Sequence, residues 1–409
     1  MRHGSDDMPD RAATPDATAL RGSNQSGMRV YNEKLVLSLV RGHGALAKSD
    51  IARMTGLSAQ TVSVIMRGLE ADGLLLRRAP VRGRIGQPSV PMALAADGAF
   101  FFGLKIGRRS ADLILVDFLG QVVGEQRLTY RYPMPDTIVR FVKTALPALR
   151  AALPAASQAR IVGLGIAMPF QLWNWMPLLG APQADMNVWR DSDIAADIAA
   201  FSDLPVSVQN DATAACGAEL VFGTGPPITD FLYFYIGYFV GGGIALNGQL
   251  YTGRTGNAGA MGPMPVPGPD GRMQHLLQAA SMASLEGYLN AAGLRGEKLW
   301  EAPVDWHMPA AILTRWVRQV AAGLAHAILS ATSVIDFDTV LIDGWFPPGI
   351  RRRVTEETGS ALAGMDLSGI VLPRVCEGTV GPRARALGAA AIPLSQRYLA
   401  DQRVLLREA

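Results

Sequence analysis

Residues 49–69 read SDIARMTGLSAQTVSVIMRGL, and this stretch decides how the rest of the chain is interpreted. The spacing of its apolar residues predicts two short amphipathic helices, over residues 48–55 and 58–72, separated by a tight turn at Gly56. Ser58 is a favourable N-cap for the second helix, whose first turn exposes small polar residues. This order of elements is typical of a helix-turn-helix, whose second helix enters the major groove of DNA.

The flanking segments extend this unit into a winged helix-turn-helix. Apolar residues at helical spacing predict a first helix that begins at Arg29 and ends near Gly42. Apolar runs predict strands at residues 73–78 and 90–94, joined by a basic turn. Three helices followed by a basic hairpin indicate a DNA-binding head, which we place at residues 28–97.

The residues expected to contact DNA lie early in the second helix of this motif and in the basic turn. Glutamine pairs bidentately with adenine, and serine or threonine contacts bases or phosphates. Arginines of a wing are attracted to narrow A·T-rich minor grooves, although a basic turn could also be a solvated loop. The predicted DNA-binding residues are Ser58, Gln60, Thr61, Ser63, Arg67, Arg82 and Arg84.

The distribution of charge supports the same assignment. The 409 residues carry a net charge of only +3, but residues 28–98 contain ten Lys and Arg against five Asp and Glu. No apolar run approaches the roughly 18 residues that cross a bilayer, and the N-terminus has no signal-peptide pattern. The two cysteines, Cys216 and Cys376, are expected to be buried free thiols. We therefore expect a cytoplasmic protein with no membrane partner.

The remaining chain has the pattern of a large α/β unit. Residues 1–27 are polar and are expected to form a disordered leader, and residues 98–409 are expected to form two lobes. Residues 170–190 and 253–272 are interpreted as loops. Strands are expected at residues 100–106, 110–116, 121–128, 160–168, 206–209, 231–236, 242–246 and 339–343, and helices at residues 135–153, 192–201, 212–222, 274–292, 309–330 and 383–397.

Three motifs in this region carry a resemblance: VQNDATAA at residues 208–215, GGGIALNGQLYTG at 241–253 and GNAG at 256–259. In this order and spacing they resemble the ROK family of repressors, uncharacterised reading frames and sugar kinases, over about residues 29–397. The resemblance implies a two-lobed, actin-like ATPase fold with a sugar in the cleft. Members with an N-terminal winged helix-turn-helix are usually regulators of sugar metabolism, and members without it are usually kinases.

The resemblance also implies a sugar site. Asp211 aligns with the family's catalytic base and Asn210 with a ligand of a sugar hydroxyl. Both could equally cap the helix that they open, because Asn and Asp are favoured at helix starts. Glu286 aligns with another sugar-binding glutamate, and Asn187 resembles a loop residue that touches sugar. The predicted ligand-binding residues are therefore Asn187, Asn210, Asp211 and Glu286.

Other positions of the family's pattern have become apolar. Ala260 stands where the family has a sugar-binding glutamate, and Pro263 stands where it has a histidine. The cysteine positions of the family's structural zinc site fall at about Leu277, Ala279 and Ser284, which cannot supply thiolates. We therefore expect no metal. A site that has lost hydrogen-bonding groups should change its specificity, so the expected effector is a less polar or modified sugar.

Both phosphate-binding turns implied by the resemblance are altered. The first, Asp-x-Gly-x-Thr in the family, reads KIGRR at residues 105–109, and the cation at Lys105 opposes Mg²⁺ binding. The second, Gly-Thr-Gly-x-Gly-Gly-Gly, reads GYFVGGG at residues 237–243, so Tyr238 and Phe239 add bulk beside the phosphate. The two arginines of the first turn could bind a different anion or could be solvated. ATP-dependent phosphorylation, and hence a nucleotide cofactor, is not expected.

These observations favour a transcriptional regulator, expected to be a repressor of carbohydrate-related genes that senses a sugar-like effector. It would act as a homodimer or homotetramer on double-stranded operator DNA with an inverted repeat. One alternative is an atypical ROK-family kinase that phosphorylates a hexose or amino sugar, which rests on Asp211 alone. Another is an architectural DNA-binding protein whose effector pocket is inactive.

Overall fold

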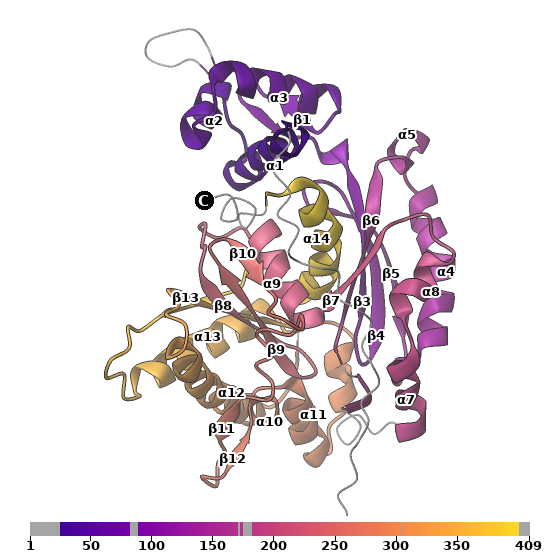
Figure 1. Cartoon of the computed structure of the whole chain (residues 1–409). Coiled ribbons are helices and arrows are strands. Elements are labelled where there is room, and N and C mark those ends of the chain that lie inside the picture. Colours follow the sequence, from indigo (N-terminus) through magenta and orange to yellow (C-terminus); the bar gives the residue numbers. More distant parts are fainter. Residues whose placement is uncertain (1–24, 82–88, 171, 175–181, 305, 401–409) are drawn as a thin grey trace, which may run out of the picture.

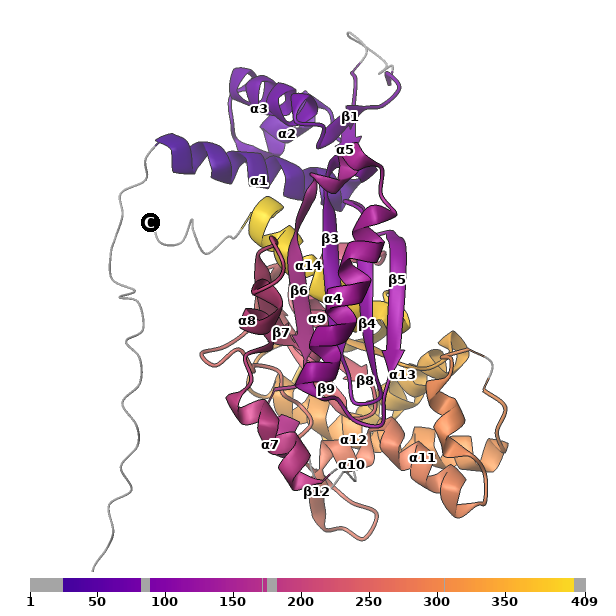
Figure 2. The same cartoon turned by 90° about the vertical axis from the view of Figure 1, so that its right-hand side faces the viewer.

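Two five-stranded sheets with equivalent strand orders form the body of the molecule (Figures 1 and 2). The computed structural model describes residues 25–81, 89–170, 172–174, 182–304 and 306–400. In each sheet three antiparallel strands are followed by two parallel ones, which is the duplicated arrangement of the actin-like fold. The first sheet has the order β5(Val122–Thr129), β4(Ser110–Val116), β3(Phe100–Ile106), β6(Ile161–Met168), β7(Val206–Asn210), and the second β10(Gln249–Tyr251), β9(Val240–Leu246), β8(Phe231–Ile236), β13(Thr339–Gly344), β14(Arg374–Glu377).

Helices cover both sheets and fill the space between them. The helices α9(Asp211–Phe222) and α14(Ala384–Tyr398) pack against each other between the two sheets (Figure 1). On the outer side of the first sheet lie α4(Pro135–Ala151), α5(Ala155–Gln158), α7(Gln183–Asp191) and α8(Ile194–Ala199). The second lobe contains α10(Leu276–Ala279), α11(Met282–Ala291), α12(Ala310–Thr332), α13(Pro348–Ala363) and the small hairpin β11(Pro265–Pro267) and β12(Met273–His275).

Small residues allow α14 to lie directly on the first sheet and on α9. A Cβ atom on Gly165 of β6 would collide with the carbonyl oxygen of Ala389. A Cβ atom on Gly388 would likewise collide with the carbonyl oxygen of Ala214 in α9. This close contact places α14 directly against both β6 and α9 at the centre of the molecule.

The N-terminal unit is the winged helix-turn-helix that the sequence predicts. Its three helices are α1(Gln25–His43), α2(Lys48–Thr55) and α3(Ala59–Ala71), and its hairpin pairs β1(Leu75–Arg77) with β2(Met92–Leu94). Buried Val36, Ile51, Val62 and Met66 form the centre of its core. The wing arginines Arg82 and Arg84 lie outside the described residues.

The head is docked on the first lobe and on the end of α14 (Figure 2). The head and lobe share one apolar cluster, in which Val36 and Leu37 of α1 belong with Leu394 of α14. Polar contacts join the same surfaces: Lys34 Nζ donates to the carbonyl of Gln396 at 2.8 Å, and Arg41 donates to the carbonyl of Phe118 at 2.6 Å. The head is therefore held against the body and does not hang on a free linker.

Several expectations from the sequence need correction. Residues 183–191, interpreted as part of a loop, form α7, and the interpreted loop at 253–272 contains β11. Cys216 is buried as expected, but Cys376 is only half-buried. Within the described ranges, no helix is long and apolar enough to cross a membrane.

Candidate functional site

The second helix of the helix-turn-helix is positioned by local interactions. Gly56 ends α2 in the left-handed region, with φ of 70°, which lets the chain turn sharply into α3. Ser58 Oγ then accepts a hydrogen bond from the backbone N–H of Thr61 at 3.1 Å and caps α3. Val62 and Met66 bury the inner face of the helix, which leaves the opposite face available.

That outer face carries three of the seven predicted DNA-binding residues. Gln60, Ser63 and Arg67 are three and four residues apart and therefore share one face of α3. Gln60 and Arg67 are exposed, whereas Ser63 is half-buried and accepts a hydrogen bond from Lys48 Nζ at 3.3 Å. The sequence interpretation missed Val64, which is 50% exposed beside them and offers an apolar contact of the kind that meets a thymine methyl group.

A cavity of about 380 Å³ lies between the two lobes. Asn210 and Asp211 line it where β7 ends and α9 begins. Asn210 Oδ1 accepts hydrogen bonds from the N–H groups of Ala212 and Thr213 at 3.0 and 3.2 Å, so the capping role left open by the sequence is present. Asp211 Oδ2 accepts a hydrogen bond from Arg385 of α14 at 3.2 Å.

The other two predicted ligand residues do not line this cavity. Asn187 lies on α7, where its side-chain oxygen accepts a hydrogen bond from Gln183 at 2.8 Å. Glu286 lies on α11 and accepts a hydrogen bond from the indole of Trp300 at 3.2 Å. Contact between either residue and a ligand stays a prediction. It would require a ligand that extends beyond the cavity, or a movement of α7 or α11 toward the cavity.

The two altered phosphate turns contact each other directly. The guanidinium of Arg108 lies 4.2 Å from the ring centre of Phe239, and that of Arg109 lies 5.7 Å from the ring centre of Tyr238. Tyr238 in turn stacks on Trp300 with ring centres 5.3 Å apart. Arg108 is only 8% exposed, so it is not the solvated loop residue that the sequence left open. Arginine–aromatic contacts thus occupy the space between the turns.

Lys105 of the first turn is buried in an ion pair. Its Nζ donates to Ser110 Oγ at 2.7 Å and to Asp112 Oδ2 at 2.8 Å. Burial lowers the pKa of Lys105 to about 8, and the nearby Asp112 opposes this change. Asp112 also pairs with Arg127 of β5 at 3.3 Å. The carboxylate that remains near this turn is therefore engaged by two cations.

The glycines of the family motifs have packing roles in this chain. A Cβ atom on Gly241 would lie 2.6 Å from the Cβ atom of Ala212 on α9. Gly259, with φ of 78°, lies so close to Gly243 that a Cβ atom would be 2.7 Å from its Cα atom. These glycines fit β9 against α9 and the adjoining loop, whether or not a nucleotide is bound.

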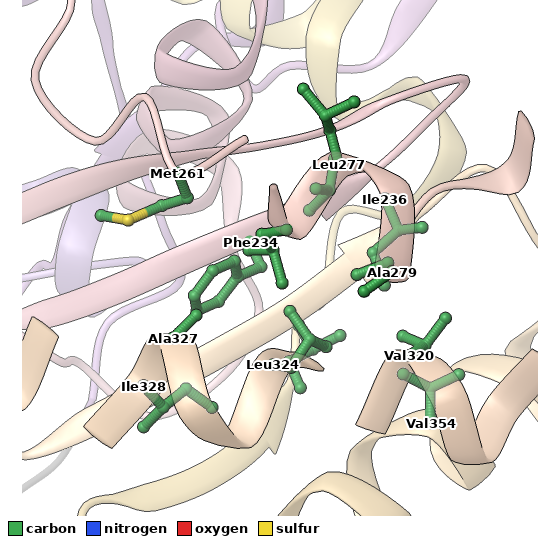
Figure 3. Packing of buried hydrophobic residues seen from close by; sticks show 14 of the residues in the cluster. Phe234, Ile236, Met261, Leu277, Ala279, Val320, Leu324, Ala327, Ile328 and Val354 are labelled. Carbon is green, nitrogen blue, oxygen red and sulfur yellow. The ribbon is translucent and has the colours of Figure 1, made fainter. Parts of the chain in front are cut away.

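The region of the family's zinc site is an apolar core. Leu277 and Ala279 of α10 are 5% and 1% exposed, and they belong to the same buried cluster as Val320 and Leu324 of α12 (Figure 3). Gly323 allows this close approach, because a Cβ atom there would lie 2.9 Å from that of Ala279. In the part of the chain that the structure describes, no three His, Cys, Asp or Glu side chains gather as metal ligands would.

Comparison with known proteins agrees with this architecture. The model of the ROK family matches residues 101–392, and that of the MarR family matches residues 31–85. An uncharacterised protein of Sinorhizobium fredii is 26% identical over 371 residues, which cover 90% of this chain and 91% of that protein. The xylose repressor of Bacillus subtilis is 23% identical over 244 residues, 60% of this chain and 62% of the repressor's length.

Among solved structures, a ROK family transcriptional regulator described as a homologue of the E. coli MLC protein superposes with a TM-score of 0.64. It is 18% identical to this chain and aligns over 93% of it and 100% of its own length. At this identity the likeness concerns the fold, and the alignment includes both the head and the two lobes.

Proposed function

The chain belongs to the ROK family, and on this premise we propose that it is a sugar-responsive transcriptional repressor. The observation that carries the proposal is the capped helix α3, which presents Gln60 and Arg67 to solvent from a head docked on a body that has a cavity between its two lobes. The curated xylose repressors and the regulator of the same fold support it. Because a repressor acts where the chromosome is, the proposed location is the cytoplasm.

The proposal includes a ROK domain that binds its ligand without phosphorylating it. A kinase must bring its phosphate turns around a nucleotide and Mg²⁺. In this chain Arg108 and Arg109 contact the aromatic side chains of Tyr238 and Phe239 in that space, and Lys105 replaces the acidic residue of the family. These contacts favour a sensor over an enzyme.

Effector binding would reach the DNA through α14. This helix of 15 residues is about 22 Å long. Arg385 in its first turn pairs with Asp211 in the cavity, and the carbonyl of Gln396 near its other end accepts a hydrogen bond from Lys34 of the head. A ligand that prefers one position of α14 would shift the population of head positions, and hence the spacing of two heads in a dimer or tetramer on an inverted repeat.

Binding of the full chain to DNA from its own upstream region tests the repressor function. We expect retardation at moderate salt, protection of an inverted repeat, and release by a sugar-like ligand. Gln60→Ala should weaken specific binding by roughly 5- to 150-fold and leave non-specific binding nearly unchanged. Arg140→Ala, an exposed change on α4, is the matched control. Failure to retard this DNA would overturn the proposal.

A sugar kinase is the second candidate, because Asp211 lines the cavity where the family places its catalytic base. A coupled assay of ADP release over common hexoses and amino sugars tests it, and we expect no turnover. Turnover that depends on added sugar and disappears in Asp211→Asn would establish the kinase and remove the non-catalytic part of the proposal.

A further inference from the structure

The charges that line the cavity do not balance. Arg108 and Arg385 both line it, and Asp211 is the one acidic residue among its described lining residues. His275, an exposed residue of the lining, adds no negative charge. Asp211 is already engaged by Arg385 at 3.2 Å. The described wall of the cavity therefore carries one more positive than negative charge at neutral pH.

This excess charge is costly in the absence of a ligand. Burial lowers the pKa of Arg108 to about 10, the charge of Asp211 opposes the change, and the charge of Arg385 adds to it. Arg385 is compensated by Asp211 and by the nearby Asp112. By contrast, burying Arg108 beside this pair is unfavourable unless further negative charge is supplied. A bound anion would remove this cost.

Arg385 also offers an unused donor. Its Nη1 donates to Asp211, and its guanidinium lies 4.9 Å from the ring centre of Tyr235. Its Nε is buried and has no hydrogen-bond partner among the described residues. A guanidinium edge with a free Nε–H is the geometry that binds a carboxylate or phosphate with two parallel hydrogen bonds.

The rest of the lining fits the carbon skeleton of a sugar. Ala260 and Pro263 supply no anion and no hydrogen-bond donor from their side chains, while Phe170, Val240 and Leu277 add apolar surface. Asn257 and Gln278 are uncharged polar residues suited to hydroxyl groups. The volume of about 380 Å³ lies within the usual range for small-molecule sites, about 300–1,000 Å³.

We propose that the effector of this cleft is a sugar that carries a carboxylate, such as a hexuronate or an aldonate, held by Arg108 and Arg385. A carboxylate supplies one negative charge, which matches the single excess positive charge. A phosphate ester would bring nearly two, beside the existing Asp211. The inference rests on the proposed function, because it assigns a ligand class to the same effector cleft.

Calorimetry of the full chain with matched ligands tests the inference without any mutation. D-Glucuronate and D-galacturonate are compared with glucuronamide, glucose and galactose, and with glucose 6-phosphate, at one ionic strength. We expect at least one carboxylate to bind about 10- to 100-fold more tightly than its amide or neutral counterpart, because hydrogen bonds to charged groups are the stronger ones. Equal or tighter binding of neutral sugars, tighter binding of the phosphate, or no binding by any carboxylate would overturn it.

Variants assign the preference to the two arginines. Arg108→Gln should bring carboxylate and amide affinities to within a few-fold, whereas the exposed Arg140→Gln should leave their ratio unchanged. Arg385→Gln also removes the partner of Asp211, so it is interpreted only if its thermal unfolding resembles that of the wild type. An unchanged ratio in Arg108→Gln would overturn the assignment.

DNA retardation separates the two proposals. If a neutral sugar releases operator DNA, the repressor function holds and the carboxylate inference fails. If a carboxylate binds with the expected preference but the chain retards no DNA, the ligand inference holds and the repressor function fails.

Discussion

Replacing Lys105 with methionine gives a quantitative test of the altered first turn. Lys105 is buried, and its Nζ contacts Asp112 Oδ2 at 2.8 Å and Ser110 Oγ at 2.7 Å. Burial, helped by the charges of Arg385 and Arg127 and opposed by Asp112, lowers its pKa from 10.5 to about 8. Methionine keeps an unbranched stem but carries no charge.

The pKa change sets the size and sign of the effect. Because the folded lysine loses its proton near pH 8 and the unfolded one near pH 10.5, the unfolded chain binds more protons between these values. The Lys105 contribution to the free energy of unfolding therefore rises with pH across this window. Relative to a lysine that stays neutral, the charged Lys105 destabilises the fold by about 3 kcal/mol at pH 7 and by about 1 kcal/mol at pH 9.5.

The difference in the free energy of unfolding between the variant and the wild type isolates the titration of Lys105 from that of other groups. Burial raises the pKa of Cys216 and Tyr233, so their titration lowers the stability of both proteins above about pH 9 and cancels in the difference. Urea unfolding at pH 7 and pH 9.5 should show the stability of Lys105→Met, relative to wild type, falling by about 2 kcal/mol as the pH rises.

Lys143→Met, an exposed change on α4, is the matched control, and its profile should run parallel to that of the wild type. A parallel profile for Lys105→Met as well would refute the reasoning, because it would mean that Lys105 keeps its charge in the fold as readily as in water.

Three further changes test the head, the helix α14 and the apolar core that stands where the family has its zinc site. Ser58→Ala removes the cap of α3 and should lower the free energy of unfolding by about 0.5–2 kcal/mol in urea titrations; no loss would mean that the hydrogen bond at 3.1 Å contributes nothing. Gly165→Ala forces a methyl group against the carbonyl of Ala389 and should cost about 3 kcal/mol or more, or prevent folding, whereas wild-type stability would show that α14 can move away. Adding a chelator should leave the melting temperature unchanged, because Leu277 packs in an apolar core; a drop of several degrees would reveal a metal.

The head and most body strands were predictable because their signals are local. The turn at Gly56 and the cap at Ser58 fix the helix-turn-helix within a few residues, and the structure reproduces the expected helices. Strands such as β3 and β8 are buried on both faces, so they appear as nearly continuous apolar runs, which only Lys105 interrupts in β3. The helix α13 was missed because its inner face includes Thr355 and Thr358, which weaken the apolar periodicity.

The cleft could be predicted only in part, because its charges come from distant segments. Asp211 was found from the motif that contains it, but its partner Arg385 is 174 residues away in the sequence. The only available signal was an arginine among the small residues at the start of α14, and that pattern does not reveal which side chain it meets. Likewise, the sequence left Arg108 as either solvated or anion-binding, and only its burial beside Phe239 separates these alternatives.

The glycine motifs explain why a family resemblance can outlast the chemistry for which the motif is known. Gly241 and Gly243 must be glycines for β9 to lie on α9, and Gly259 must be one to approach Gly243 with a positive φ. Selection for a folded protein is therefore enough to retain them. Tyr238 and Phe239 are constrained differently, because Phe239 belongs to the buried core of the second lobe, Tyr238 packs against that core, and both contact arginines of the first turn. The glycines thus indicate the fold of the chain. The residues at positions 238 and 239 indicate whether a nucleotide has room to bind.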